Sequence, residues 1–176
     1  MKRPVGAAFV ISQPFGVKAQ VYTDLGYLGH HGIDLACPKG TPVYAAEEGD
    51  VLWAIPNDPT AGGFIHLYGH PGGLQTRYLH NSELLVSRAE HVAKGQLIAM
   101  SGGVPGEYGA GITDGPHVHF ELIDPSQLGN GYKGRIDPGP YLEDTMPRTP
   151  AQQRIIDVLV INRAQRTVGI KDMIQA

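Results

Sequence analysis

Glycine and proline recur along almost the whole chain, and their distribution restricts the fold more than any other feature of the sequence. The 176 residues include 24 glycines and 14 prolines, which are spread out rather than gathered in one segment. Both residue types interrupt helices and mark turns. This distribution favours many short strands joined by turns over a helical fold.

Eight segments between the turn signals are typical of strands. They comprise residues 9–12, 32–36, 42–46, 49–55, 64–68, 74–80, 96–101 and 117–123. The turns between them are marked by Pro38-Lys39-Gly40, Pro71-Gly72-Gly73 and Lys94-Gly95. The glycine-rich segment 103–115 is expected to be a longer loop that forms one wall of a groove.

The last part of the chain has a different pattern. Thr149–Gln152 offers an N-cap, a proline at the first helical position and a glutamine at the third, and apolar residues then recur at helical spacing. We expect a helix over about residues 147–168, in an extension of residues 146–176 appended to a β domain of residues 1–145. Its apolar stripe is expected to pack on the domain; the alternative is that it binds a larger phage or wall assembly.

Composition excludes several classes of protein. The formal net charge of −3 gives no basic surface for nucleic acid or anionic lipid, and no segment approaches the length of a membrane span. Cys37 is the single cysteine, which excludes an internal disulfide. The apolar run Val5–Ile11 after Lys2-Arg3 is too short for a secretory signal, and no small-residue cleavage site follows it.

Histidines carry the chemical signal. The chain has eight, and several lie in short motifs. The first motif places His30 and Asp34 four residues apart, Arg77–His80 carries a single histidine, and the last motif contains His117 and His119. Each of these motifs alone is a weak signal, because short matches occur often by chance.

The last motif can be interpreted as a strand. Over residues 117–123, alternate apolar side chains form one face that would fill the core, while His117, His119 and Glu121 form the opposite face. Two imidazoles about 7 Å apart at the backbone can reach a common point in front of the sheet. The alternative is a solvated outer face with incidental histidines.

The motifs together indicate a zinc site. A histidine and a carboxylate from the first motif, with a histidine from the last, supply three nitrogen and oxygen ligands of the kind that zinc prefers. Three protein ligands leave a fourth position for water, which is the arrangement of catalytic rather than structural zinc sites.

These motifs carry a resemblance to a known family. Residues 30–51 (HHGIDLACPKGTPVYAAEEGDV), 77–80, 92–98 (VAKGQLI) and 115–121 (GPHVHFE) resemble the lysostaphin-type, or LytM, zinc endopeptidases. Residues 11–16 and 136–142 are similar to the family's entry and exit strands, so the resemblance covers about residues 9–142. It implies a mainly β, antiparallel, sandwich-like fold with a groove that holds zinc.

The resemblance also implies residue roles. His30, Asp34 and His119 would hold one zinc ion per chain, and His80 and His117 would be catalytic histidines beside it. We expect His117 to be the general base and His80 the electrophilic helper, although the sequence does not fix which is which. His30 rather than His31 is chosen because the family spaces its first pair as His-x-x-x-Asp, and on an extended chain His31 points the other way.

The implied reaction is hydrolysis of peptide cross-links in bacterial peptidoglycan. Lacking a recognisable signal peptide, the protein would reach the wall by phage delivery or release from the cytoplasm. Three alternatives stay open: a non-catalytic module of this family that binds or activates another wall hydrolase, a metal-dependent amidase or dipeptidase, and a structural zinc domain of a phage tail.

The remaining candidates have simpler interpretations. Glu121 either orients an imidazole or is solvated. Cys37 is expected to be a small buried apolar residue rather than a fourth ligand, and Tyr22 or Tyr27 is a candidate to assist the oxyanion. The histidines outside the motifs are expected to lie at the surface; they are His66, His70 and His91.

Overall fold

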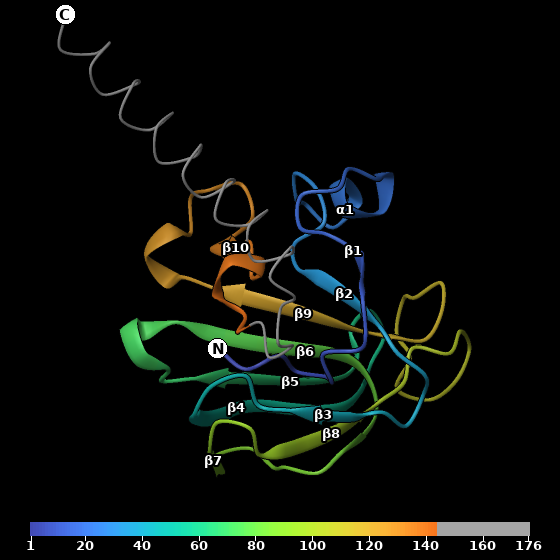
Figure 1. The fold of residues 1–176 in the computed structure, drawn as a ribbon. Coiled ribbons are helices and arrows are strands. Elements are labelled where there is room, and N and C mark those ends of the chain that lie inside the picture. The colour runs from blue at the N-terminus through green and yellow to red at the C-terminus, as the bar shows by residue number, and fades with distance from the viewer. Residues whose placement is uncertain (144–176) are drawn as a thin grey trace, which may run out of the picture. The chain divides into compact units, whose positions relative to one another are not determined.

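The computed structural model describes residues 1–143, which form a mainly β domain (Figure 1). Its strands are β1 (Ile11–Gln13), β2 (Ile33–Ala36), β3 (Pro42–Tyr44), β4 (Gly49–Asp58), β5 (Gly62–Tyr68), β6 (Gln75–Leu84), β7 (His91–Val92), β8 (Leu97–Ser101), β9 (His117–Ile123) and β10 (Arg135–Ile136). Helical structure within these residues is limited to α1 (Gln20–Asp24) and the single 3₁₀ turns η1 (Pro71–Gly73), η2 (Pro125–Gln127) and η3 (Gly139–Tyr141).

All strand pairs in the described domain are antiparallel and belong to one branched sheet. The main path runs β1-β2-β9-β6-β5-β4-β7, β10 pairs with β9, and β3 joins through β8 to β6. The mainly β, antiparallel fold expected from the sequence is therefore confirmed. The expected C-terminal helix lies outside the described residues, so this helix and the division after residue 145 stay predictions.

The sheet branches at β6, because this strand changes partners along its length. Its first part, Gln75–Leu79, pairs with β9, and the part from Asn81 to Leu84 pairs with β8. His80 lies between the two parts and has a φ angle of 63°, a left-handed conformation that is uncommon for a residue other than glycine. This local bend places the His80 side chain where the two branches of the sheet separate.

The core lies on one side of β9. Val118 and Phe120 belong to the main apolar cluster of buried residues, whereas His117, His119 and Glu121 lie on the opposite face of the strand. All seven residues of β9 are buried. The expected alternation is therefore confirmed, and the alternative of a solvated outer face is wrong, because polar side chains and loops cover that face too.

Most predicted strands are found close to their expected positions. The main differences are β6, which runs four residues beyond its predicted end at His80 to Leu84, and the two-residue strands β7 and β10, which were too short to give a periodic signal. The short helix α1 was also missed; no side chain caps it, and none of its residues is buried.

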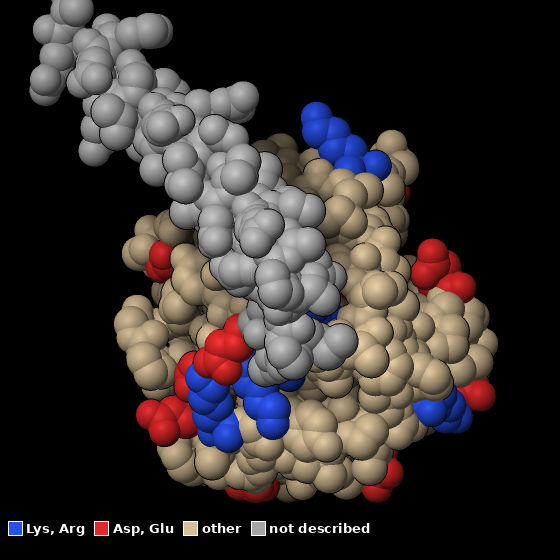
Figure 2. Space-filling model, viewed as in Figure 1, with Lys and Arg blue, Asp and Glu red and all other residues tan. Residues whose placement is uncertain are grey.

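Charged side chains are dispersed over the surface. On the face drawn in Figure 2, lysine and arginine occur in small separate groups, several of them beside acidic side chains. Within residues 1–143, no helix is both long enough and apolar enough to cross a membrane.

Candidate metal centre

Two side chains, from β2 and the segment just before it, meet a third from β9. The pairing of β2 with β9 sets Asp34 directly opposite His119, and His30 precedes β2 by three residues. Oδ1 of Asp34 lies 2.8 Å from Nδ1 of His119 and 3.2 Å from Nε2 of His30. The two histidine nitrogens are 2.9 Å apart. The structure thus brings together the three residues that the resemblance implied as metal ligands.

These three atoms fit a zinc site by their spacing and chemistry. Ligands bonded to zinc at about 2.0–2.1 Å in a tetrahedron are separated from one another by about 3.3 Å, close to the separations of 2.8–3.2 Å found here. One carboxylate and two imidazoles are also a donor set that zinc prefers. His30, Asp34 and His119 could therefore hold a zinc ion with little rearrangement.

The ring of His30 is held in the orientation that such a site requires. Its Nδ1–H donates to the carbonyl of Pro14 at 3.0 Å, which leaves the lone pair of Nε2 directed at Asp34 and His119. The side chain is 1% exposed. A second hydrogen bond of this kind is the usual device by which proteins fix the tautomer of a metal-binding histidine.

The charge state of the cluster follows from its contacts. Burial raises the pKa of Asp34, but its contacts with His119 and His30 outweigh this and hold the pKa well below its usual range. Burial lowers the pKa of His119, yet the contacts with Asp34 and Glu121 outweigh it and raise the pKa to about 9. Without an ion, the charge on Asp34 is therefore balanced by an imidazolium.

The two expected catalytic histidines lie beside this cluster. The His80 and His117 rings are 4.8 Å apart, and Nε2 of His117 is 3.6 Å from Oδ1 of Asp34. The Nδ1–H groups of His80 and His117 donate to the carbonyls of Ala110 and Gly115 at 2.7 and 2.8 Å. Nε2 of each ring is consequently free to act on a bound molecule.

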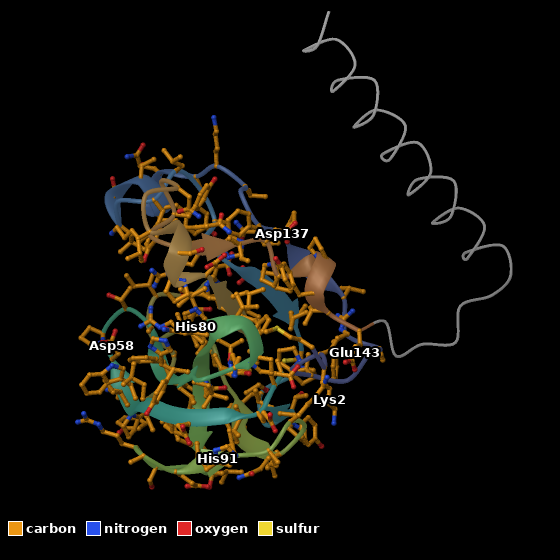
Figure 3. All side chains as sticks on the ribbon, turned by 90° about the vertical axis from the view of Figure 1, so that its left-hand side faces the viewer. Lys2, Asp58, His80, His91, Asp137 and Glu143 are labelled. Carbon is orange, nitrogen blue, oxygen red and sulfur yellow. The ribbon has the colours of Figure 1, made fainter. Side chains whose placement is uncertain are left out.

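Burial, followed by the neighbouring charges of His119 and His117, lowers the pKa of His80 to about 3. His80 is therefore a neutral imidazole at ordinary pH. In Figure 3 it lies near the middle of the domain, whereas the exposed His91 lies at the lower edge.

A cleft opens over these residues. It is lined by the ligand cluster, by both catalytic candidates, by apolar side chains such as Val21, Leu25 and Ile112, and by Asp114. The wall includes residues of α1 and of the 103–115 loop, as expected for that loop. The cleft is a site where an extended peptide could reach the metal centre.

Glu121 lies in a buried environment. Its side chain is 1% exposed, and it contacts Arg77, Arg135, His31 and His119, so the solvated interpretation is wrong. Burial raises the pKa of Glu121, but contacts with His119 and His31 and the charges of both arginines hold it well below its usual value.

His31 takes a position different from that of its neighbour. Its Nε2 lies 3.2 Å from Oε1 of Glu121, and its ring stacks on Tyr27 at 4.0 Å between ring centres. His31, His119 and Glu121 form a second group that satisfies the spacing of metal ligands. Tyr22 instead lines the cleft beside His30, where its hydroxyl accepts a hydrogen bond from Gln13.

The other candidates have clear outcomes. Cys37 is buried within the apolar core and belongs to neither ligand group among the described residues. His91 is exposed, as predicted, and His66 is half-buried. The prediction that His70 lies at the surface is wrong, since His70 is 2% exposed. Its ring donates to the carbonyl of Glu48 and contacts the Thr76 hydroxyl.

The fold and this donor set define a β domain with a candidate metal site, and comparison with known proteins identifies its family. Residues 28–135 match peptidase family M23. The chain therefore belongs to that family, which confirms the resemblance to lysostaphin-type endopeptidases.

Individual relatives agree with this assignment. The chain is 35% identical over 133 residues to the peptidoglycan DD-endopeptidase ShyA of Vibrio cholerae, a match that covers 76% of this chain and 29% of ShyA. The crystal structure of a zinc-containing peptidase from Vibrio cholerae superposes with a TM-score of 0.60 at 31% identity, covering 77% of this chain and 37% of that one. The fold also matches lysostaphin from Staphylococcus simulans, with a TM-score of 0.63 at 24% identity, over 85% of this chain and 60% of lysostaphin. The chain spans less than a third of the length of the curated relatives it matches.

Proposed function

We propose that this chain is a zinc-dependent endopeptidase that hydrolyses peptide cross-links of bacterial peptidoglycan. The observation that carries the proposal is the cluster of His30, Asp34 and His119 in a cleft that His80 and His117 also line. Membership of family M23 and the similarity to a peptidoglycan endopeptidase point to the same reaction class. The protein would act at the cell wall, with peptidoglycan peptides as its partners.

The reaction divides between the ion and the protein. A bound zinc ion supplies Lewis acidity, which polarises a carbonyl group and makes water a nucleophile near neutral pH. Nε2 of His117, close to Asp34, would accept a proton from the attacking water and return it to the leaving amine. Nε2 of His80 faces the same space and would contact the oxygen of the scissile carbonyl. Because both rings donate Nδ1–H to the backbone, these two roles could be exchanged, so their assignment is part of the proposal.

Digestion of purified peptidoglycan, with mass analysis of the soluble products, tests the proposal. We expect the zinc-loaded chain to release peptides with new amino termini, and the identity of those termini distinguishes a stem-peptide cross-link from a glycine bridge. The His119→Ala variant should release none. Intact wall after incubation with a zinc-loaded chain would contradict the proposal and favour a non-catalytic binding or activating module. Release of whole stem peptides from the glycan would indicate an amidase instead.

A further inference from the structure

We infer that Glu121 is a positioning residue, which holds His119 in the orientation and tautomer required of a metal ligand; this rests on the proposed zinc site. The two residues lie on the same face of β9, two positions apart, so both side chains project to the side opposite the apolar core. Nδ1 of His119 faces Asp34 and His30. The other ring nitrogen, Nε2, is directed toward Glu121.

The buried Nε2 of His119 needs an acceptor. Within the described part of the chain, this atom has no hydrogen-bond partner, and Oε1 of Glu121 lies 3.5 Å from it. A buried polar atom without a partner is destabilising. Glu121 is therefore the group that can satisfy Nε2–H when Nδ1 is occupied by a metal.

Two arginines keep the Glu121 carboxylate ionised and fixed. Its Oε2 lies 3.0 Å from Nε of Arg135 and 3.5 Å from Nη1 of Arg77. If the side chain turned Oε2 away, the guanidinium groups of both arginines would lose this carboxylate oxygen as a partner. Oε1 is consequently held on the side of the imidazoles, with His31 at 3.2 Å.

His119 differs in this respect from His30, His80 and His117, which also line the cleft. Those three donate to backbone carbonyls, namely of Pro14, Ala110 and Gly115. Only His119, among these four, has a carboxylate next to its second nitrogen. A carboxylate acceptor makes the imidazole a stronger donor to a metal than a carbonyl does, and loss of such a partner typically weakens metal binding about 10–100-fold.

The same contacts argue against a second metal ion between His31, His119 and Glu121. Although these atoms are close enough to share a cation, the carboxylate already faces the positive charges of Arg77 and Arg135. A further cation would be repelled by both. The arrangement instead serves the ligand cluster on the other side of the His119 ring.

Substitution of Glu121 by glutamine gives a specific test, because the variant is nearly isosteric. Both arginines are donors, so the amide oxygen must face them and the amide NH₂ must face the imidazoles. An NH₂ group favours the His119 tautomer with its lone pair on Nε2 and its proton on Nδ1, where the metal should bind. We therefore expect Glu121→Gln to bind zinc about 10–100-fold more weakly in competition with a chelator.

The matched control is His70→Gln, which removes a buried polar side chain outside the site. This control should lower the stability of the metal-free protein and leave zinc affinity unchanged. Arg135→Gln keeps the carboxylate but removes one of its two cations, so it should weaken zinc binding less than Glu121→Gln; it also serves if the latter does not fold. In the zinc-loaded wild type, nitrogen NMR shifts should show His119 coordinated through Nδ1 and protonated at Nε2.

Unchanged zinc affinity in both Glu121→Gln and Arg135→Gln would overturn the inference, and so would coordination of His119 through Nε2. An equal loss of zinc affinity in His70→Gln, where none is expected, would mean that Glu121→Gln acts only through stability and would also overturn the inference. These readouts do not use wall cleavage. If the chain fails to digest peptidoglycan but Glu121→Gln weakens zinc binding, the proposed function fails and the inference about Glu121 stands.

Discussion

Three of the histidines around the cleft use one ring nitrogen for the protein and direct the other toward the centre. His30, His80 and His117 donate their Nδ1–H groups to backbone carbonyls. This fixes each tautomer before any ligand binds. The division of labour between ligands and catalytic groups therefore depends on where each Nε2 points, which local sequence does not reveal.

Replacing either catalytic candidate should separate metal binding from chemistry. We expect His80→Ala and His117→Ala to retain one zinc ion per chain, since neither side chain belongs to the ligand cluster. Peptide release should fall by about 10²–10⁴-fold, the usual contribution of an acid–base group. Zinc content and the rate of peptide release are the measurements.

His80→Gly is a matched variant for this experiment. Because His80 has a φ of 63°, glycine should relieve backbone strain and make this variant more stable than His80→Ala by about 1 kcal/mol. Both variants should be equally inactive. Wild-type activity in either one would exclude His80 from catalysis.

Asp114 should influence which peptides are cut. It is exposed at the cleft, and no lysine or arginine lines that cleft; among residues 1–143 it has no ion pair. An exposed pair of opposite charges gains about 1 kcal/mol, so a free amine near the scissile bond should increase kcat/KM roughly fivefold. Asp114→Asn should remove this preference without slowing an uncharged peptide. Equal preferences in the two proteins would contradict the role of Asp114.

At the scale of residues, sequence spacing and family resemblance predicted five residues that the structure brings together, but not their surroundings. Glu121 was placed on the correct face of its strand, yet its burial could not be predicted, because Arg77 comes from β6 and Arg135 from β10. His70 was misinterpreted for the same reason. Its partners Glu48 and Thr76 are brought to it by the fold.

At the scale of elements, the site depends on how closely β2 approaches β9. Gly32 lies immediately before β2, and a Cβ atom there would be 2.5 Å from the carbonyl oxygen of Phe120 and 2.7 Å from Nε2 of His119. A side chain at this position must push the two strands apart. The glycine between the first ligand pair is thus required by packing.

Gly32→Ala should therefore damage both the fold and the metal site. We expect a loss of about 1–3 kcal/mol in the free energy of unfolding, as for other overpacked positions, together with weaker zinc binding because His119 is displaced. Denaturant unfolding of the metal-free protein and chelator competition measure the two effects. Gly129→Ala, where no atom lies within 4 Å of the new Cβ, is the control and should change neither. Wild-type zinc affinity in Gly32→Ala would show that the approach of these strands does not set the ligand geometry.

Strands could be predicted from the sequence where polar and apolar residues alternate over several positions. β9 has seven residues of alternating polarity and was predicted with its exact bounds. β7 consists of two residues paired with β4, and no pattern of that length exceeds chance. The change of partner within β6 at His80 also escaped prediction, since a left-handed histidine depends on tertiary contacts.

At the scale of the whole molecule, buried imidazoles should make stability depend on pH. Burial lowers the pKa of His70 from its ordinary value of 6.5, so the folded protein keeps this ring neutral while the unfolded chain takes up a proton. The contribution of His70 is then complete above pH 6.5 and decreases as the pH falls below it.

We expect the metal-free protein to lose stability between pH 7 and pH 5, with a limiting slope for His70 of about 1.4 kcal/mol per pH unit. In His70→Gln this part of the loss should be absent, although the variant is less stable at pH 8. Denaturant midpoints across the pH range provide the measurement. An unchanged pH dependence in His70→Gln would mean that other groups account for the whole effect.

The described domain presents two ligand groups that share His119 through different nitrogens. Anomalous X-ray diffraction at the zinc edge, on crystals of the zinc-loaded chain, distinguishes them directly. We predict a single ion at about 2.0–2.2 Å from Nε2 of His30, a carboxylate oxygen of Asp34 and Nδ1 of His119. An ion located instead between His31, Glu121 and Nε2 of His119, or no bound zinc, would contradict the proposed metal centre.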